Sequence, residues 1–361
     1  MSTVAMMAAT KVASAPVVKD TTAAAITTSG SPYIHAVPLN STTGFGARYA
    51  DPAVLPAQYT NSVVFSPKQT VIASTYGYPS IYVDCYKWDN ITGFGTKFAD
   101  PSIALPAVAN RPTFNAAGDR IAFALASSPF LAVYEWNDVT GFGTKFADPD
   151  ITGLPAFPAA AAVAFAPDNK SISISLNLSP FIVTWAWDNT AGFGARYSNP
   201  ATLPEGGGVS IGYTSASDAI IMSTGIYPAY LIGYPWNSVT GYGSRYADPI
   251  QNPNTSQVPI KLSPDGKVIL GQRASTAGGG TFGALRFDSV TGYGTRYAEA
   301  PLAVGTVVGV DWTKDGKAAI IAAASAPTGI VGFRWDNATG FGAQLTAPTG
   351  LSVSGTWMAT N

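Results

Sequence analysis

One segment of this 361-residue chain occurs seven times, and its second copy reads Trp88-Asp89-Asn90-Ile91-Thr92-Gly93-Phe94-Gly95-Thr96-Lys97-Phe98-Ala99-Asp100-Pro101. The first glycines of the seven copies are Gly44, Gly93, Gly141, Gly192, Gly241, Gly292 and Gly340. Neighbouring copies are therefore 48 to 51 residues apart. A period of this length exceeds that of ankyrin or tetratricopeptide repeats and is typical of units built from several β-strands.

Short runs of β-branched and aromatic residues separate the copies. In the second repeat they cover residues 63–65, 70–74 and 81–88, and residues 95–99 form a fourth run. Proline, glycine and asparagine bound these runs, as expected for strands. No segment shows an apolar period of 3.6 over the ten or more residues that a helix needs. The sequence therefore predicts an all-β chain with four antiparallel strands per repeat.

Seven units of four short strands predict a seven-bladed β-propeller. Near the end of the chain, residues 352–358 resemble a first strand, while residues 23–39 resemble a second and a third strand. We therefore expect a composite blade in which Trp357 and Ile26 share one sheet and close the ring, which removes free strand edges. Alternatively, residues 12–16 supply the first strand and the tail is a spare docking strand. The predicted organisation is an arm of residues 1–16 followed by one propeller domain of residues 17–361.

Each repeat carries residues with an evident structural role. An Asp or Asn side chain caps the turn after the third strand, and the following glycine takes a positive φ. A large ring ends the third strand in most repeats, where core packing between blades is favoured over stacking on a sugar. These rings are Trp88, Trp136, Trp187, Trp236 and Trp335.

Composition excludes several classes of function. Charged residues make up 11% of the chain and the net charge is −1, whereas soluble domains average roughly 25% charged residues. Nucleic acid is not an expected partner, because its binding needs a basic face. Cys85 is the one cysteine, so no internal disulfide can form. We expect no signal peptide in residues 1–30, because they contain no sustained run of about 7 to 15 apolar residues before a cleavage site. We also expect no membrane insertion, because no stretch of about 20 residues is free of polar or turn residues.

Few residues are suited to catalysis, so we expect no enzyme, no cofactor and no metal. His35 is the one imidazole, which excludes a zinc site of several histidines. Cys85 lies in an apolar strand, an environment that raises the pKa of a thiol. The glycine runs at 206–208 and 278–280 lack the Lys-Ser/Thr of a phosphate-binding loop. Asp311, beside Trp312, is the best single candidate for chemistry in the central channel.

Six repeats place Arg or Lys four residues after the first glycine, and in five of them an acid follows three residues later. The series allows a basic ring for an anionic partner, but the alternating acids favour outer-strand charges that prevent foreign strand pairing. The Asp-Pro pairs allow calcium ligands, although turn initiation already explains them. The basic residues are Arg48, Lys97, Lys145, Arg196, Arg245 and Arg296, and the acids are Asp51, Asp100, Asp148, Asp248 and Glu299.

Proline-containing loops between the second and third strands carry aromatic residues. A ring on a stiff loop offers contact area at low entropic cost, which suits an interaction surface. Alternatively, the rings fold back over the channel mouth. The predicted interaction residues are Tyr33, Tyr76, Tyr78, Phe130, Phe181 and Tyr227.

The run Leu262-Ser263-Pro264-Asp265-Gly266-Lys267 together with the Trp-Asp-x-x-Thr-Gly pattern resembles WD40 propellers, although the Gly-His pair of that family is missing. The longer form, Thr-Gly-Phe-Gly-Thr-Lys-Phe-Ala-Asp-Pro, is similar to WD40-like propellers of tailed bacteriophages. This resemblance implies a virion component such as a tail, fibre or capsid-surface protein, with other virion proteins or a host surface receptor as partners. The implied location is the virion, and otherwise the cytoplasm.

The expected function is therefore a non-enzymatic platform for protein interactions. A receptor- or glycan-binding, lectin-like propeller is the alternative. A third hypothesis is a hydrolase or lactonase centred on the channel, which would need a retained metal and a cluster of carboxylates at one channel mouth.

Overall fold

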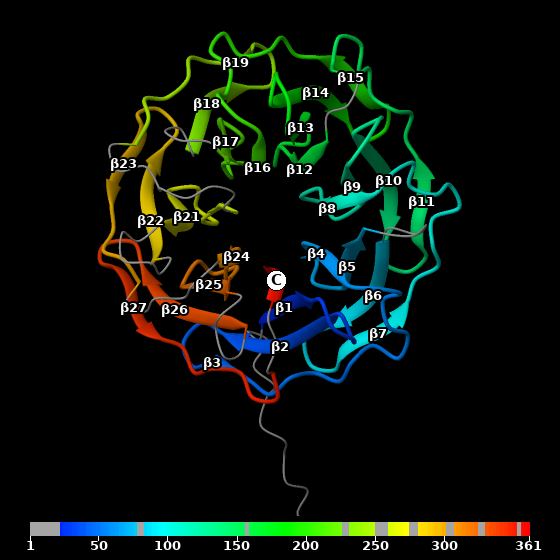
Figure 1. Ribbon diagram of the computed structural model, residues 1–361, viewed down its shortest axis with the longest axis vertical. Coiled ribbons are helices and arrows are strands. Elements are labelled where there is room, and N and C mark those ends of the chain that lie inside the picture. Colours follow the sequence, from blue (N-terminus) through cyan, green and yellow to red (C-terminus); the bar gives the residue numbers. More distant parts are fainter. Residues whose placement is uncertain are drawn as a thin grey trace, which may run out of the picture.

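The computed structural model describes residues 22–77, 83–155, 159–225, 231–249, 259–273, 281–300, 307–323, 329–351 and 355–361. Seven four-stranded antiparallel sheets surround a central opening, with the first strand of each sheet innermost (Figure 1). The predicted seven-bladed β-propeller is confirmed. Within the described ranges, no helix has the length and apolar character needed to cross a membrane.

The blades are numbered in chain order from the composite one. Blade 1 contains β28 (Gly355–Thr360), β1 (Thr22–Thr28), β2 (Ile34–Asn40) and β3 (Gly44–Phe45). Blade 2 contains β4 (Thr60–Phe65), β5 (Val71–Tyr76), β6 (Val83–Asp89) and β7 (Gly93–Lys97). Blade 3 contains β8 (Ala109–Phe114), β9 (Arg120–Leu125), β10 (Leu131–Asn137) and β11 (Gly141–Lys145). Blade 4 contains β12 (Ala160–Phe165), β13 (Ser171–Leu176), β14 (Ile182–Asp188) and β15 (Gly192–Arg196).

The remaining three blades complete the ring. Blade 5 contains β16 (Gly208–Tyr213), β17 (Ala219–Thr224), β18 (Leu231–Asn237) and β19 (Gly241–Tyr242). Blade 6 contains β20 (Lys261–Leu262), β21 (Val268–Arg273), β22 (Thr281–Asp288) and β23 (Gly292–Arg296). Blade 7 contains β24 (Val307–Trp312), β25 (Ala318–Ala323), β26 (Ile330–Asp336) and β27 (Gly340–Gln344).

The ring is closed by pairing β28 with β1. Ile26 lies opposite Met358 and Thr27 lies opposite Trp357 in this antiparallel pair. The Asn361 side chain extends the pairing, because its Oδ1 accepts a hydrogen bond from the Ala23 amide at 2.6 Å. The predicted composite blade is therefore confirmed. The alternative first strand at residues 12–16 and the predicted arm of residues 1–16 lie outside the described residues.

The fourth strands begin earlier than predicted. In blade 2 the strand starts at Gly93, which pairs with Asp89, and not at residue 95. A register shift in β6 between Tyr86 and Trp88 then brings Lys97 opposite Tyr86. Gly93 is therefore both the last residue of the turn and the first residue of β7.

The turn before each fourth strand depends on side-chain capping and on glycine. In blade 2, Asp89 Oδ1 accepts hydrogen bonds from the amides of Ile91 and Thr92, both at 2.9 Å. Gly93 follows with a φ of +83°, and a Cβ there would lie 2.9 Å from the Tyr49 ring. The seven repeat glycines have φ values between +83° and +106°, so each needs the freedom that glycine alone offers.

Capping makes the fold sensitive to acid. Backbone amides hold the pKa values of Asp89, Asp188, Asp288 and Asp336 below the ordinary value. A carboxyl whose pKa is lower in the folded state stabilises the fold above its unfolded pKa of about 4 and loses this effect as pH falls through the folded value. We expect the free energy of unfolding, measured in urea, to fall below pH 4. Replacing all four by Asn, which already caps the blade 3 turn as Asn137, should flatten this dependence; an unchanged slope would contradict the prediction.

Large rings fill the spaces between blades. The Trp136 side chain is only 4% exposed and lies edge-on to Phe98 and Phe142, with ring centroids 5.1 and 4.9 Å away. Its Nε1 donates a hydrogen bond to Asp138 Oδ1 at 2.9 Å. The corresponding residues Trp88, Trp187, Trp236 and Trp335 are also buried. These rings are part of the core and offer no surface to a sugar.

Removing one of these rings should be costly. We expect Trp136→Ala to lower the free energy of unfolding by about 3–5 kcal/mol, because both the burial and the packing of the ring are lost. Val139 lies three residues away and is 75% exposed, so Val139→Ala should change stability by no more than about 0.5 kcal/mol. Urea unfolding of both variants measures the difference, and equal midpoints would contradict this assignment of the core.

Candidate functional site

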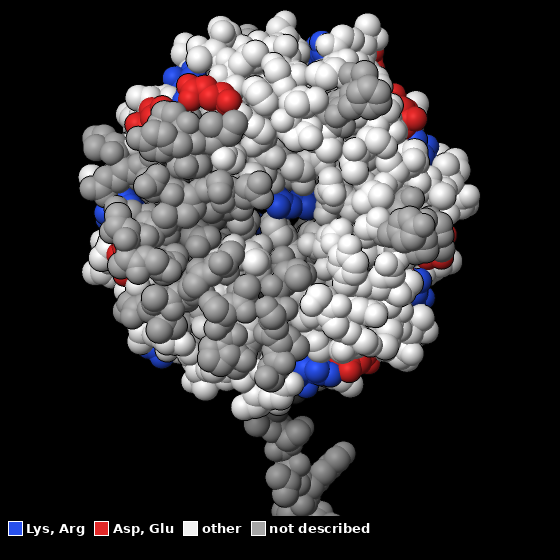
Figure 2. Space-filling model, viewed as in Figure 1, with Lys and Arg blue, Asp and Glu red and all other residues white. Residues whose placement is uncertain are grey.

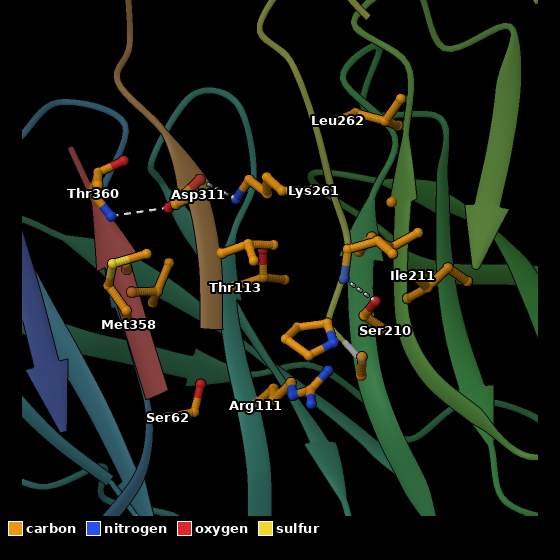
Figure 3. A pocket seen from close by; sticks show the side chains of 18 of the residues that line it. Ser62, Arg111, Thr113, Ser210, Ile211, Lys261, Leu262, Asp311, Met358 and Thr360 are labelled. Atoms are coloured by element: carbon orange, nitrogen blue, oxygen red, sulfur yellow. Dashed lines mark hydrogen bonds and ion pairs between the residues drawn. The ribbon is translucent and has the colours of Figure 1, made fainter. Parts of the chain in front are cut away.

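The first strands of the blades line a cavity of about 440 Å³ in the central channel. Volumes of this order hold small-molecule ligands in many proteins. Its charged side chains come from three strands: Arg111 from β8, Lys261 from β20 and Asp311 from β24. Basic atoms are visible at the centre of the ring in Figure 2. Figure 3 shows Lys261 and Asp311 facing each other, with Arg111 further along the same cavity.

Lys261 and Asp311 form an ion pair in the channel wall. Lys261 Nζ lies 3.3 Å from Asp311 Oδ1, and the Asp311 side chain is 8% exposed. Both residues immediately precede the residue that anchors the first strand in their blades, Leu262 and Trp312. Because blades 6 and 7 are neighbours, the same repeat position brings the two side chains together. The Lys261 side chain is about half exposed, so its ammonium group remains accessible from the channel.

Ring closure positions the Asp311 carboxylate. The Thr360 amide, in β28, donates a hydrogen bond to Asp311 Oδ2 at 2.9 Å (Figure 3). The Trp312 amide donates to Asp311 Oδ1 at 2.9 Å. The Trp312 indole also donates to the Lys261 carbonyl oxygen at 3.3 Å. The composite blade therefore holds the one carboxylate that lines the described cavity.

Arg111 places a second positive charge in the channel. Its guanidinium lies 4.0 Å from the centroid of the Trp357 ring, a cation–π contact, and Nη1 donates to the Val209 carbonyl oxygen. Burial lowers the pKa of Arg111 to about 10, so the group stays charged at neutral pH. No carboxylate among the described residues forms an ion pair with it. Two cations and one carboxylate give the described lining a net charge of +1.

This arrangement suits chemistry on a small anion. A carboxylate held by two amides can accept a proton from water, and a neighbouring ammonium can stabilise negative charge on an oxygen. The described residues contain no group of three His, Cys, Asp or Glu side chains that could hold a metal ion. A channel-centred lactonase was expected to need a cluster of carboxylates at one channel mouth, whereas Asp311 is the one carboxylate among the described residues that line the cavity.

The other candidates for chemistry lie away from the channel. His35 is buried in β2, and its pKa falls to about 4 through burial and the charge of Arg48, although Asp51 opposes this. Cys85 is buried in β6, where burial and then the charge of Asp84 raise the pKa of its thiol.

The rim charges are paired with each other. Figure 2 shows acidic and basic side chains lying together around the edge of the ring. Arg48 lies 2.6 Å from Asp51, and Arg245 lies 2.6 Å from Asp248. Such pairs neutralise a basic ring, as the alternating sequence predicts.

The predicted aromatic loop surface is only partly exposed. Tyr76 is the last residue of β5, and both Tyr76 and Phe130 are 2% exposed. Tyr33 and Phe181 are half-buried, and Phe181 packs against the core of blade 5. Tyr78 and Tyr227 lie outside the described residues. The rings of Tyr76 and Phe130 therefore give little contact area, and the surface as a whole stays a prediction.

Among known proteins, the chain is similar to solved structures but not to any family model or curated sequence. A provisionally named 6-phosphogluconolactonase of Bacteroides uniformis matches with a TM-score of 0.70 at 16% identity, over 95% of this chain and all of that chain. Another of Bacteroides fragilis has a TM-score of 0.67 at 16% identity, with 95% and 98% covered. A periplasmic gluconolactonase of Pseudomonas aeruginosa has a TM-score of 0.69 at 12% identity, with 94% and 99% covered.

These findings correct the functional expectation. The expectation of a virion component rested on resemblance to WD40 and phage propellers. The expectation of a non-enzymatic chain rested on the scarcity of catalytic side chains, and the glycan-binding alternative rested on the aromatic loops. The comparisons support neither resemblance, and three of the solved structures that share the fold carry lactonase names. The expectation that the chain is not an enzyme is overturned with it. That expectation rested on a thin inventory of catalytic side chains, in which Asp311 was the best single candidate. It did not include the Lys261 ammonium, which lies 3.3 Å from Asp311.

Proposed function

We propose that this chain is a hydrolase that opens a small anionic lactone in its central channel. The observation that carries the proposal is the ion pair of Lys261 and Asp311 in a cavity that also holds the Arg111 guanidinium. The net positive charge of the described lining favours an anionic substrate. The names of structurally similar propellers support a lactone as the substrate class.

The residues can share the reaction as follows. Asp311 accepts a proton from water while the water oxygen attacks the lactone carbonyl carbon. The Lys261 ammonium stabilises the negative charge that develops on the carbonyl oxygen. The bond between the carbonyl carbon and the ring oxygen then breaks, and the proton passes from Asp311 to that oxygen. The product is the open-chain hydroxy acid, and no other reactant is consumed.

The second cation accounts for the preference for an anion. Arg111 lies in the same cavity, and its guanidinium presents several donors in one plane, a geometry that fits phosphate or carboxylate oxygens. A phosphorylated sugar lactone therefore gains an interaction that the unphosphorylated one lacks.

The test is an assay of lactone opening. Glucono-1,5-lactone and its 6-phosphate are incubated with the purified chain at pH 7, and acid release is followed with a pH indicator against the spontaneous rate. We expect faster opening with the protein and a higher kcat/KM for the phosphorylated lactone. Rates equal to the spontaneous ones for both compounds would overturn the proposal. If the protein accelerates opening equally for both lactones, the result supports hydrolase activity but contradicts the proposed role of Arg111 in binding the phosphate group.

A further inference from the structure

Blade 2 has a carboxylate where the repeat does not need one. Asp84 stands four residues before the ring that ends the third strand, and its side chain is fully buried. Five of the other six blades place glycine or an apolar residue there, and blade 1 has His35. These five residues are Ala132, Val183, Ile232, Gly283 and Val331. The fold itself therefore does not require a charge at this position.

Lys97 makes its shortest ion pair with this buried carboxylate. Its Nζ lies 2.5 Å from Asp84 Oδ1 and 3.6 Å from Asp100 Oδ1. In other blades the basic residue at the same repeat position pairs with the acid three residues later, as Lys145 does with Asp148. Lys97 thus lies between a buried carboxyl and a second, more exposed one.

The surroundings of Asp84 are short of hydrogen-bond donors. Among the described residues, Ser74 Oγ and Tyr86 Oη are buried and make no hydrogen bond. The Asp84 carboxylate itself has two partners, the Lys97 ammonium and the Ala57 backbone. Ser74 lies directly opposite Asp84 on the neighbouring strand. Burying an ion pair with so few partners is unfavourable. Such an environment favours a reaction of the two groups that removes both charges.

We propose that Lys97 Nζ and Asp84 Cγ form an intramolecular isopeptide bond that staples β7 to β6. The Lys97 ammonium first passes a proton to the Asp84 carboxylate, and the neutral amine attacks Cγ. Asp100 accepts the second proton from Nζ and returns it to the departing hydroxyl group. One N–C bond forms, one C–O bond breaks and one water molecule leaves, so no oxidant or cofactor is needed.

The protonation states are consistent with this route. Burial raises the pKa of Asp84, although Lys97 opposes the shift. Burial alone would lower the pKa of Lys97, but its contacts with Asp84 and then Asp100 raise it. The raised pKa of Asp84 favours the protonated carboxyl that the amine attacks, whereas the raised pKa of Lys97 opposes the loss of its proton.

Intact mass spectrometry of the denatured full chain tests the bond. We expect a mass lower than that of the sequence by one water molecule, and a tryptic peptide in which the segments containing Asp84 and Lys97 are joined. Lys97→Arg and Asp84→Ala should each restore the full sequence mass. Lys145→Arg is the matched control, because the corresponding position in blade 3 is Ala132, and it should still lose one water.

The wild-type mass alone decides the matter, so the outcome does not depend on whether the variants fold. A wild-type chain that keeps the full sequence mass after prolonged incubation at neutral pH overturns the proposal. A water loss that persists in Lys97→Arg also overturns it, because the modification would then lie elsewhere. Asp100→Asn should slow the appearance of the lighter species, which supports the proton transfer by Asp100.

Discussion

A chain that lacks residues 355–361 should lose its cooperative unfolding transition. These residues include β28 (Gly355–Thr360), which pairs with β1 from Ala24 to Thr28 and buries Met358 against the core shared by blades 1 and 7. Without β28 the hydrogen-bonding edge of β1 is open and Ile26 loses a covering side chain. We expect a loss above about 5 kcal/mol, which is the low end of the total stability of a domain. Circular dichroism during urea unfolding measures the effect.

A peptide spanning the missing strand is the matched control. Because β28 is held by pairing and packing, the peptide should restore a cooperative transition when it is added in excess to the shortened chain. A peptide in which Met358 is replaced by Asp should not restore it, because it would bury a charge. A shortened chain that unfolds with the same midpoint as the full chain would show that β28 does not close the ring.

Replacement of Asp311 by Asn should lower kcat/KM for lactone opening by about 10²–10⁴-fold, the usual contribution of a positioned proton acceptor. Asn can keep the hydrogen bond from the Thr360 amide, so the loss should fall on kcat more than on KM. The measurement is the acid-release assay with the variant and the wild type at equal concentration.

The rim supplies the control for this variant. Asp148 pairs with Lys145, is half-exposed and does not line the cavity, so Asp148→Asn should leave the rate unchanged. If Asp311→Asn retains full activity, Asp311 is not the proton acceptor. If both variants lose activity equally, the loss reflects a general effect on the fold.

The blades could be predicted because their signals are local and repeated. Each Asx–glycine turn needs a capping side chain and a positive φ, and both requirements are visible in one copy of the repeat. Ring closure was also predictable, because Trp357 fits the first-strand pattern and Ile26 the second. The first and last residues of the strands were harder to predict, because the register shift beside Trp88 arises from pairing between strands.

The channel site was only partly predictable. Asp311 stood out beside Trp312, but Lys261 and Arg111 were missed. A signal was present: in five of the seven repeats, the position held by Lys261 and Asp311 carries the uncharged residues Thr356, Val64, Thr113, Ala164 and Gly212. Lys261 and Asp311 lie 3.3 Å apart because blades 6 and 7 are neighbours. This proximity can be inferred from the sequence only when the seven repeats are aligned with one another.

The aromatic loops show a different limit. Proline beside an aromatic residue marks a loop, but it does not say which way the ring points. Tyr76 proved to be the end of a strand and Phe130 part of the core between blades 3 and 4. Side-chain direction here depends on neighbouring blades, which a local pattern does not describe.

The shared blade has a consequence for synthesis on the ribosome. β1 leaves the exit tunnel before all the other described strands, yet its partner β28 follows them all. At usual translation speeds this interval is on the order of tens of seconds. Throughout this interval β1 has an unpaired edge, so chaperones that shield such edges should associate with the chain until β28 has left the tunnel and paired with β1.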